Sequence, residues 1–180
     1  LSNELKVDTI ISSMLVRRGI TNYSQAKFFF RPSLNQLHDP FLMKDMNIAV
    51  ERILSAIEKK ESILIYGDYD VDGTSSVALL SSYMKELGAI CSYYIPDRNS
   101  EGYGISLKAI DMASSNNQRL VIALDCGIKA HSQVEYALNK KIDFIICDHH
   151  NPSETLPNAL AVLNPKRQDC SYPFKELCGC

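Results

Sequence analysis

Residues 62–74 read SILIYGDYDVDGT, and this stretch decides the fold. Its first five residues are mostly apolar and Gly67 ends the run, which predicts a buried strand over 62–66. Three carboxylates follow at alternate positions: Asp68, Asp70 and Asp72. Unpaired carboxylates are too costly to bury in a core, and clustered negative charges repel one another. We therefore expect a cation at this point, and oxygen ligands suit Mg²⁺, Mn²⁺ or Ca²⁺.

The chain beyond this stretch alternates between predicted strands and predicted helices. We predict strands over 62–66, 90–95, 119–124, 142–147 and about 160–163. We predict helices over 74–87, 106–115 and 130–140. Strands that alternate with helices of this length indicate βαβ units and a parallel sheet. The predicted fold class is α/β, an open, mostly parallel Rossmann-like sheet flanked by helices.

Residues 1–60 are predicted to form an N-terminal helical segment that precedes the sheet. Apolar spacing predicts helices over 3–18 and 45–60, with a short helix and a turn-rich link over 21–43. We therefore divide the chain into this segment and a sheet domain over 61–180.

Composition and charge exclude few classes of function. No apolar run approaches the ~18 residues of a membrane span, and no signal peptide opens the chain, so we expect no membrane contact. The six cysteines have no disulfide-framework spacing, which is typical of reduced thiols in the cytoplasm. Acidic residues outnumber basic ones over 61–150. Bound divalent metals would reverse that local field, so this acidity does not exclude a phosphate-rich substrate.

Polar residues also follow two later strands of the predicted sheet. Asp125 follows the third strand, and the run Asp148-His149-His150 follows the fourth. Because the carboxyl ends of parallel strands meet at one edge, we expect these residues to converge with the acidic stretch. Carboxylates with imidazoles suit Mn²⁺ or Mg²⁺, and two bridged ions form a clamp used in phosphoester hydrolysis. Adjacent residues usually point to opposite sides, so one histidine can bind metal while the other faces substrate.

Three rival interpretations compete for these motifs. An EF-hand loop needs a preceding helix and a glutamate where Leu79 stands, so it is rejected. An aspartyl-phosphatase motif would use Asp70 as nucleophile and Asp72 as acid/base, but it leaves Asp125 and both histidines unexplained. A zinc site would use three cysteines without paired CxxC spacing: Cys170, Cys178 and Cys180.

With GDYDVDGT, DCGI and DHH, the sequence resembles the DHH phosphoesterase superfamily. Within it, the sequence resembles the RecJ family of single-strand-specific exonucleases. Further stretches carry this resemblance: 38–46, 94–106, 163–167 and 172–179. The resemblance therefore extends over nearly the whole chain.

The resemblance implies a set of metal ligands for Mn²⁺ or Mg²⁺, with two ions in the intact enzyme. That set is Asp70, Asp72, Asp125 and His149. Asp125 would bridge the ions, and Asp68 would ligate or support them as part of the catalytic group. Other family members have a histidine where Tyr66 stands, which implies fewer protein ligands at one ion.

The resemblance also implies contacts to substrate. His150 would contact the scissile phosphate. A loop could approach another phosphate, although a plain turn is the alternative; its residues are Arg98, Gly102 and Gly104.

The function implied by the resemblance is that of the N-terminal catalytic lobe of a 5′ to 3′ single-stranded-DNA exonuclease in DNA repair and recombination. Family members continue with a fourth acidic motif, a second domain that grips substrate, and an OB-type domain. We therefore expect a fragment, weak or inactive alone, whose partners are single-stranded DNA and the missing C-terminal domains. Two alternatives stay open: a small-substrate phosphodiesterase or oligoribonuclease, and a non-catalytic module that binds nucleic acid.

Overall fold

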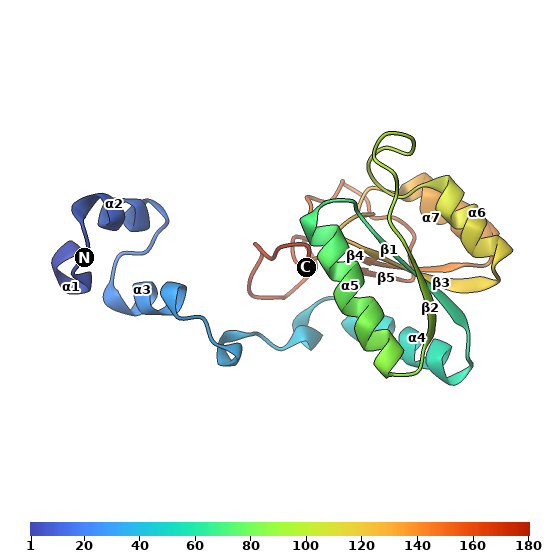
Figure 1. Cartoon of the computed structure of the whole chain (residues 1–180), viewed down its shortest axis with the longest axis horizontal. Coiled ribbons are helices and arrows are strands. Elements are labelled where there is room, and N and C mark those ends of the chain that lie inside the picture. Colours follow the sequence, from blue (N-terminus) through green and yellow to red (C-terminus); the bar gives the residue numbers. More distant parts are fainter. The chain divides into compact units, whose positions relative to one another are not determined.

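The computed structural model describes residues 1–180 and falls into two units, Leu1–His38 and Asp39–Cys180 (Figure 1). Helix α4 (Met46–Glu58) belongs to the larger unit, where its buried Ala49 and Ala56 pack into the core beneath the sheet. The observed division therefore precedes α4. Our boundary between residues 60 and 61 stays a prediction. None of the helices is long and apolar enough to cross a membrane.

A five-stranded parallel sheet forms the centre of the larger unit, in the order β2-β1-β3-β4-β5. Its strands are β1 (Ser62–Gly67), β2 (Ile90–Tyr94), β3 (Gln118–Leu124), β4 (Asp143–Cys147) and β5 (Ala161–Leu163). The predicted α/β class with a parallel sheet is confirmed. Strand β1 lies between β2 and β3, which places the acidic stretch near the middle of the sheet edge.

Helices cover both faces of this sheet (Figure 1). The connecting helices are α5 (Val71–Glu86), α6 (Leu107–Ser115) and α7 (His131–Asn139). Successive residues of a strand point to opposite faces, so Ile63 and Ile65 pack with α4 and α5 whereas Leu64 packs with α6 and α7. A strand buried on both faces must be apolar throughout, which explains the continuous run in β1.

Helix α5 begins at Val71, so the prediction that it starts at residue 74 is wrong. The carboxylate of Asp70 accepts a hydrogen bond from the backbone N–H of Gly73 at 3.0 Å and caps the helix. Asp72 therefore lies in the first helical turn, not in a loop. Gly73 is required there, because a Cβ atom would lie 2.3 Å from the carbonyl oxygen of Asp68.

The smaller unit contains three helices and one 3₁₀ turn. They are α1 (Ser2–Leu5), α2 (Thr9–Arg17), α3 (Tyr23–Phe30) and η1 (Leu34–Gln36), and a further 3₁₀ turn, η2 (Pro40–Leu42), lies in the larger unit. The single helix predicted over 3–18 is wrong, because Lys6 adopts a left-handed backbone with φ of 55°. The Asp8 carboxylate then caps a new helix by accepting the N–H of Ile10 at 2.7 Å.

Candidate metal centre

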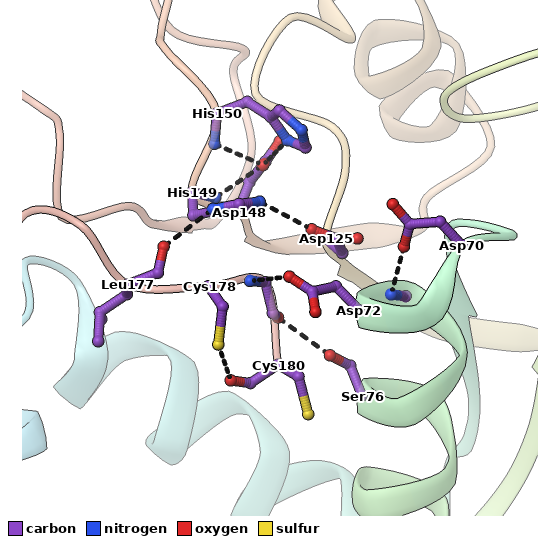
Figure 2. A network of polar contacts seen from close by, with 12 residues as sticks. Asp70, Asp72, Ser76, Asp125, Asp148, His149, His150, Leu177, Cys178 and Cys180 are labelled. Atoms are coloured by element: carbon purple, nitrogen blue, oxygen red, sulfur yellow. Dashed lines mark hydrogen bonds and ion pairs between the residues drawn. The ribbon is translucent and has the colours of Figure 1, made fainter. Parts of the chain in front are cut away.

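The carboxyl ends of β1, β3 and β4 bring the strand-end residues of the sequence together (Figure 2). Two groups of side chains have ligand atoms within 4.8 Å of one another. One group is Asp68, Asp70 and Asp125, and the other is Asp125, His149 and His150. Asp125 belongs to both groups, which places a single carboxylate between the acidic stretch and the paired histidines.

Asp125 is almost completely buried, with 1% of its surface exposed, and its backbone adopts a φ of 61°. Neither carboxylate oxygen has a hydrogen-bond partner. Burial, with a contribution from nearby Asp70, raises the pKa of Asp125 to about 7. A buried carboxylate without donors is costly, so this residue fits a role in binding a cation.

The imidazole of His149 faces the carboxylate of Asp125 in an arrangement that also fits a bound cation. Its Nδ1 lies 2.9 Å from the carbonyl oxygen of Leu177, and a carbonyl only accepts, so Nδ1 carries the proton. In the neutral ring, Nε2 then presents a lone pair 3.1 Å from Oδ1 of Asp125. Two acceptors that face each other need a proton or a metal ion between them. Carboxylates and imidazole together suit Mn²⁺ or Mg²⁺.

Asp148 orients the histidines and belongs to neither ligand group. Its Oδ2 accepts the N–H of Ile128 at 2.9 Å, and its Oδ1 accepts the backbone N–H groups of His149 and His150. Oδ1 also lies 2.7 Å from Nδ1 of His150, and this contact holds the imidazole ring of His150 beside Asp148. The two imidazole centroids are 4.5 Å apart, so the expectation that the rings point to opposite sides is wrong.

The remaining predicted ligands differ in their burial and in their hydrogen bonds. Asp68 is buried, which raises its pKa, and one of its oxygens has no partner. Asp70 is exposed, and the hydrogen bond from Gly73 lowers its pKa. Asp72 lies outside both groups, and its Oδ2 accepts the N–H of Gly179 at 2.8 Å. The ligand roles of these three carboxylates stay predictions.

Neither ligand group contains a cysteine. All six thiols are free, and Cys170 is buried in a small core with Met43 and Tyr172. Its sulfur lies 3.7 Å from that of Met43, which gives it an apolar packing role.

The predicted substrate loop lies beside the site, where Tyr103 and Gly104 line a cavity with Asp148 and His150. Gly102 and Gly104 have φ of 76° and 89°, a left-handed backbone that favours glycine. The guanidinium carbon of Arg98 lies 5.2 Å from the centre of the Tyr69 ring, a cation–π contact. The contacts of these residues with a phosphate stay predictions.

Sequence reasoning missed Tyr103, which lies between the two glycines of this loop. Its hydroxyl lies 3.5 Å from Nε2 of His150. Tyr103 and His150 also line a cavity of about 300 Å³ beside the two ligand groups, together with Ile105, Ile128 and Lys129. No local pattern marks Tyr103, because its partners are distant in the sequence.

Tyr66 anchors the same loop and is not free to act as a ligand. Its hydroxyl donates to the carbonyl oxygen of Gly104 at 2.7 Å and accepts the N–H of Ser106 at 3.2 Å. The side chain is 1% exposed and its ring stacks on Tyr94. The tyrosine at this position therefore fixes the shape of the loop that carries Tyr103.

The Tyr66→Phe variant should loosen this loop. Two hydrogen bonds are lost, at about 1 kcal/mol each, so amide exchange over residues 97–106 should become faster. Tyr136→Phe is the matched control, since the hydroxyl of Tyr136 donates to the Asp111 carboxylate on helix α6 and not to this loop. Unchanged exchange in Tyr66→Phe would show that the loop does not depend on this anchor.

Comparison with known proteins identifies the family of the chain. The family model described as "DHH family, N-terminal domain" matches residues 62–180. The single-stranded-DNA-specific exonuclease RecJ of Bacillus subtilis is 39% identical over 179 residues, covering 99% of this chain and 23% of the relative. RecJ of Escherichia coli is 40% identical over 134 residues, covering 73% of this chain and 23% of the relative. The chain thus spans about a quarter of the length of these relatives.

Solved structures agree with the fold. A crystal structure of exonuclease RecJ bound to manganese matches with a TM-score of 0.68 at 29% identity, covering 74% of this chain and 34% of that one. RecJ from Thermus thermophilus in complex with Mn²⁺ has a TM-score of 0.71 over 99% of this chain and 24% of that one, at 24% identity, which shows the fold alone. The predicted resemblance to RecJ proteins is confirmed. On the match over residues 62–180, the chain belongs to the DHH family.

Proposed function

We propose that this site hydrolyses phosphodiester bonds with two divalent cations, Mn²⁺ or Mg²⁺. The observation that carries the proposal is the buried Asp125, which belongs to both ligand groups and whose oxygens accept no hydrogen bond. A manganese-bound RecJ structure with the same fold supports the choice of metal. In such a site, bound cations activate a water molecule and neutralise charge on the phosphoryl oxygens.

The ligands of the two cations are assigned as follows. Asp68, Asp70 and Asp125 hold one cation, with Asp72 as the further ligand that the family resemblance implies. Asp125 and His149 hold the other.

His150, which Asp148 orients, contacts the scissile phosphate. The carboxylate of Asp148 accepts Nδ1–H of His150 and turns its Nε2 away from Asp148. When His150 is protonated, this Nε2–H donates to an oxygen of the scissile phosphate.

We further propose that the substrate is single-stranded DNA, degraded from 5′ to 3′ in DNA repair and recombination. The names of the RecJ relatives support this substrate class. The loop with Arg98, Gly102 and Gly104 would contact the DNA backbone. The strand would be gripped by C-terminal domains of the same polypeptide, because the relatives are about four times as long as this chain. Six free thiols agree with a reducing compartment, and we place the protein in the cytoplasm.

The test is a degradation assay with the full-length polypeptide and Mn²⁺. Long DNA with a 5′ single-stranded tail should be shortened from its 5′ end with release of mononucleotides. Blunt duplex and a 3′-tailed duplex should persist. Hydrolysis of di- to tetranucleotides alone would instead favour the small-substrate phosphodiesterase. Binding of DNA without hydrolysis, and without Mn²⁺ binding, would favour the non-catalytic module.

A further inference from the structure

We propose that the backbone of residues 177–179 is a positioning element of this centre and that position 179 accepts only glycine. The segment contacts one ligand residue in α5 and the ligand residues that directly follow β3 and β4. This inference rests on the proposed metal-dependent hydrolysis. Figure 2 shows the segment crossing the site between the paired histidines and helix α5. Nothing in the three sequence motifs points to it, because it lies more than 25 residues beyond the last of them.

The first contact fixes the imidazole of His149. The carbonyl oxygen of Leu177 accepts Nδ1–H of His149 at 2.9 Å, which leaves Nε2 as the free lone pair on the side of Asp125. A metal-binding histidine needs such a partner on its other nitrogen, since that partner sets both tautomer and ring orientation. Because a backbone carbonyl provides it, this contact survives any change of side chain at position 177.

The second contact fixes the Gly179 peptide on helix α5. Its N–H donates to Oδ2 of Asp72 at 2.8 Å, and its carbonyl oxygen accepts Oγ–H of Ser76 at 3.0 Å. Asp72 and Ser76 are four residues apart and therefore share one face of the helix. Ser76 is 7% exposed, so its hydroxyl is committed to this contact. The peptide thus orients Asp72 while one oxygen of that carboxylate stays available.

The third contact is the close approach of Gly179 to Asp125, which excludes a side chain at position 179. A Cβ atom at position 179 would lie 1.8 Å from Oδ1 of Asp125 and 2.4 Å from its Cγ. The Asp125 carboxylate is buried, so a residue larger than glycine at position 179 must displace either Asp125 or the segment. The neighbouring Cys178 and Cys180 are exposed and face no such restriction.

The consequence is that one piece of backbone holds His149 and Asp72 by hydrogen bonds and packs closely against Asp125. The ligands come from three separate elements, and preorganised ligands bind a cation without first having to be ordered. Loss of a partner that orients a metal ligand typically costs 10- to 100-fold in metal affinity or activity. Position 179 should therefore control metal affinity although its residue has no side chain to bind a metal.

The experiment compares Mn²⁺ affinity of the full-length wild type with that of Gly179→Ala, measured by electron paramagnetic resonance titration. We expect at least a tenfold weaker affinity, with kcat reduced and KM for DNA nearly unchanged. Cys180→Ala is the matched control, because that side chain is exposed and adjacent, and its affinity should equal that of the wild type. Nitrogen-15 spectra of His149 should show the Nδ1–H tautomer in the wild type and a mixture in Gly179→Ala.

A second variant covers the case in which Gly179→Ala does not fold. Ser76→Ala removes only the hydroxyl that holds the Gly179 carbonyl, and it should weaken Mn²⁺ binding about threefold or more. Wild-type affinity and tautomer in a folded Gly179→Ala, or wild-type affinity in Ser76→Ala, would overturn this inference alone. Failure of the wild type itself to bind Mn²⁺ would instead overturn the proposed function on which the inference rests.

Discussion

The Asp125→Asn variant of the full-length protein should lose hydrolysis, with kcat at least about 10³-fold below the wild type, the upper range for one group that stabilises transition-state charge. Asp125 is the one residue common to both ligand groups, so its replacement weakens the binding of both cations. The amide is nearly isosteric but neutral, and it can offer only one oxygen. Rates with saturating Mn²⁺ and 5′-tailed DNA give the measurement. Turnover at the wild-type rate would exclude the two-metal mechanism.

The same variant has a second expected effect, on the stability of the metal-free protein. Burial raises the pKa of Asp125 in the folded state to about 7, from 3.8 in the unfolded chain. The folded state therefore binds this proton more tightly, and the stability linked to it is present at low pH and is lost as the pH rises through 7. Asparagine cannot ionise, so Asp125→Asn should lose less thermal stability between pH 5 and pH 8.

Asp111→Asn is the matched control for this pH effect. Asp111 is an exposed carboxylate that contacts Lys140 and Tyr136. Its removal should leave the change in Tm between pH 5 and pH 8 close to that of the wild type, with both proteins measured in EDTA. The explanation would be wrong if Asp125→Asn and Asp111→Asn changed this pH dependence equally.

The Arg167→Met variant should produce the largest loss of stability. The guanidinium is 7% exposed and donates to Asp45, to the carbonyl oxygen of Val162 in β5 and to both oxygens of Asp169. Removing one partner of a buried ion pair leaves the other charge uncompensated, which costs roughly 3–5 kcal/mol. The free energy of opening, measured by amide hydrogen exchange in β5, should fall by about that amount.

Two further variants separate the ion pair from general disruption. Arg119→Met removes an exposed arginine and should change the same free energy by less than about 0.5 kcal/mol. Asp45→Asn combined with Arg167→Met should recover part of the loss, since no buried charge then lacks a partner. Asparagine suits that position, because Asp45 has a left-handed backbone with φ of 67°. A double variant as unstable as Arg167→Met would contradict this explanation.

The sheet could be predicted from the sequence because its signals are local. The apolar runs of β1, β3 and β4 end in polar residues, and parallel topology alone then places Asp68, Asp125 and Asp148 at one edge. The beginning of α5 could not be predicted in the same way. Its position depends on whether the Asp70 carboxylate caps Gly73, a choice between neighbouring side chains that periodicity does not report.

The surroundings of the ligands were less predictable for a different reason. Tyr66 contacts Gly104, and Gly179 contacts Asp72, across separations of 38 and 107 residues. Such contacts depend on the final packing and leave no spacing in the sequence. The orientation of His150 likewise follows from its bond to Asp148, which overrides the usual alternation of adjacent side chains.

The most direct test of the metal centre is an anomalous-scattering map from crystals of the full-length protein soaked in Mn²⁺. We predict manganese peaks in contact with Asp125, one of them shared with Asp68 or Asp70 and the other with His149. A single peak on Asp70 and Asp72, with both imidazoles turned away, would contradict the two-metal centre and favour an aspartyl nucleophile. The absence of any peak at millimolar Mn²⁺ would contradict it as well.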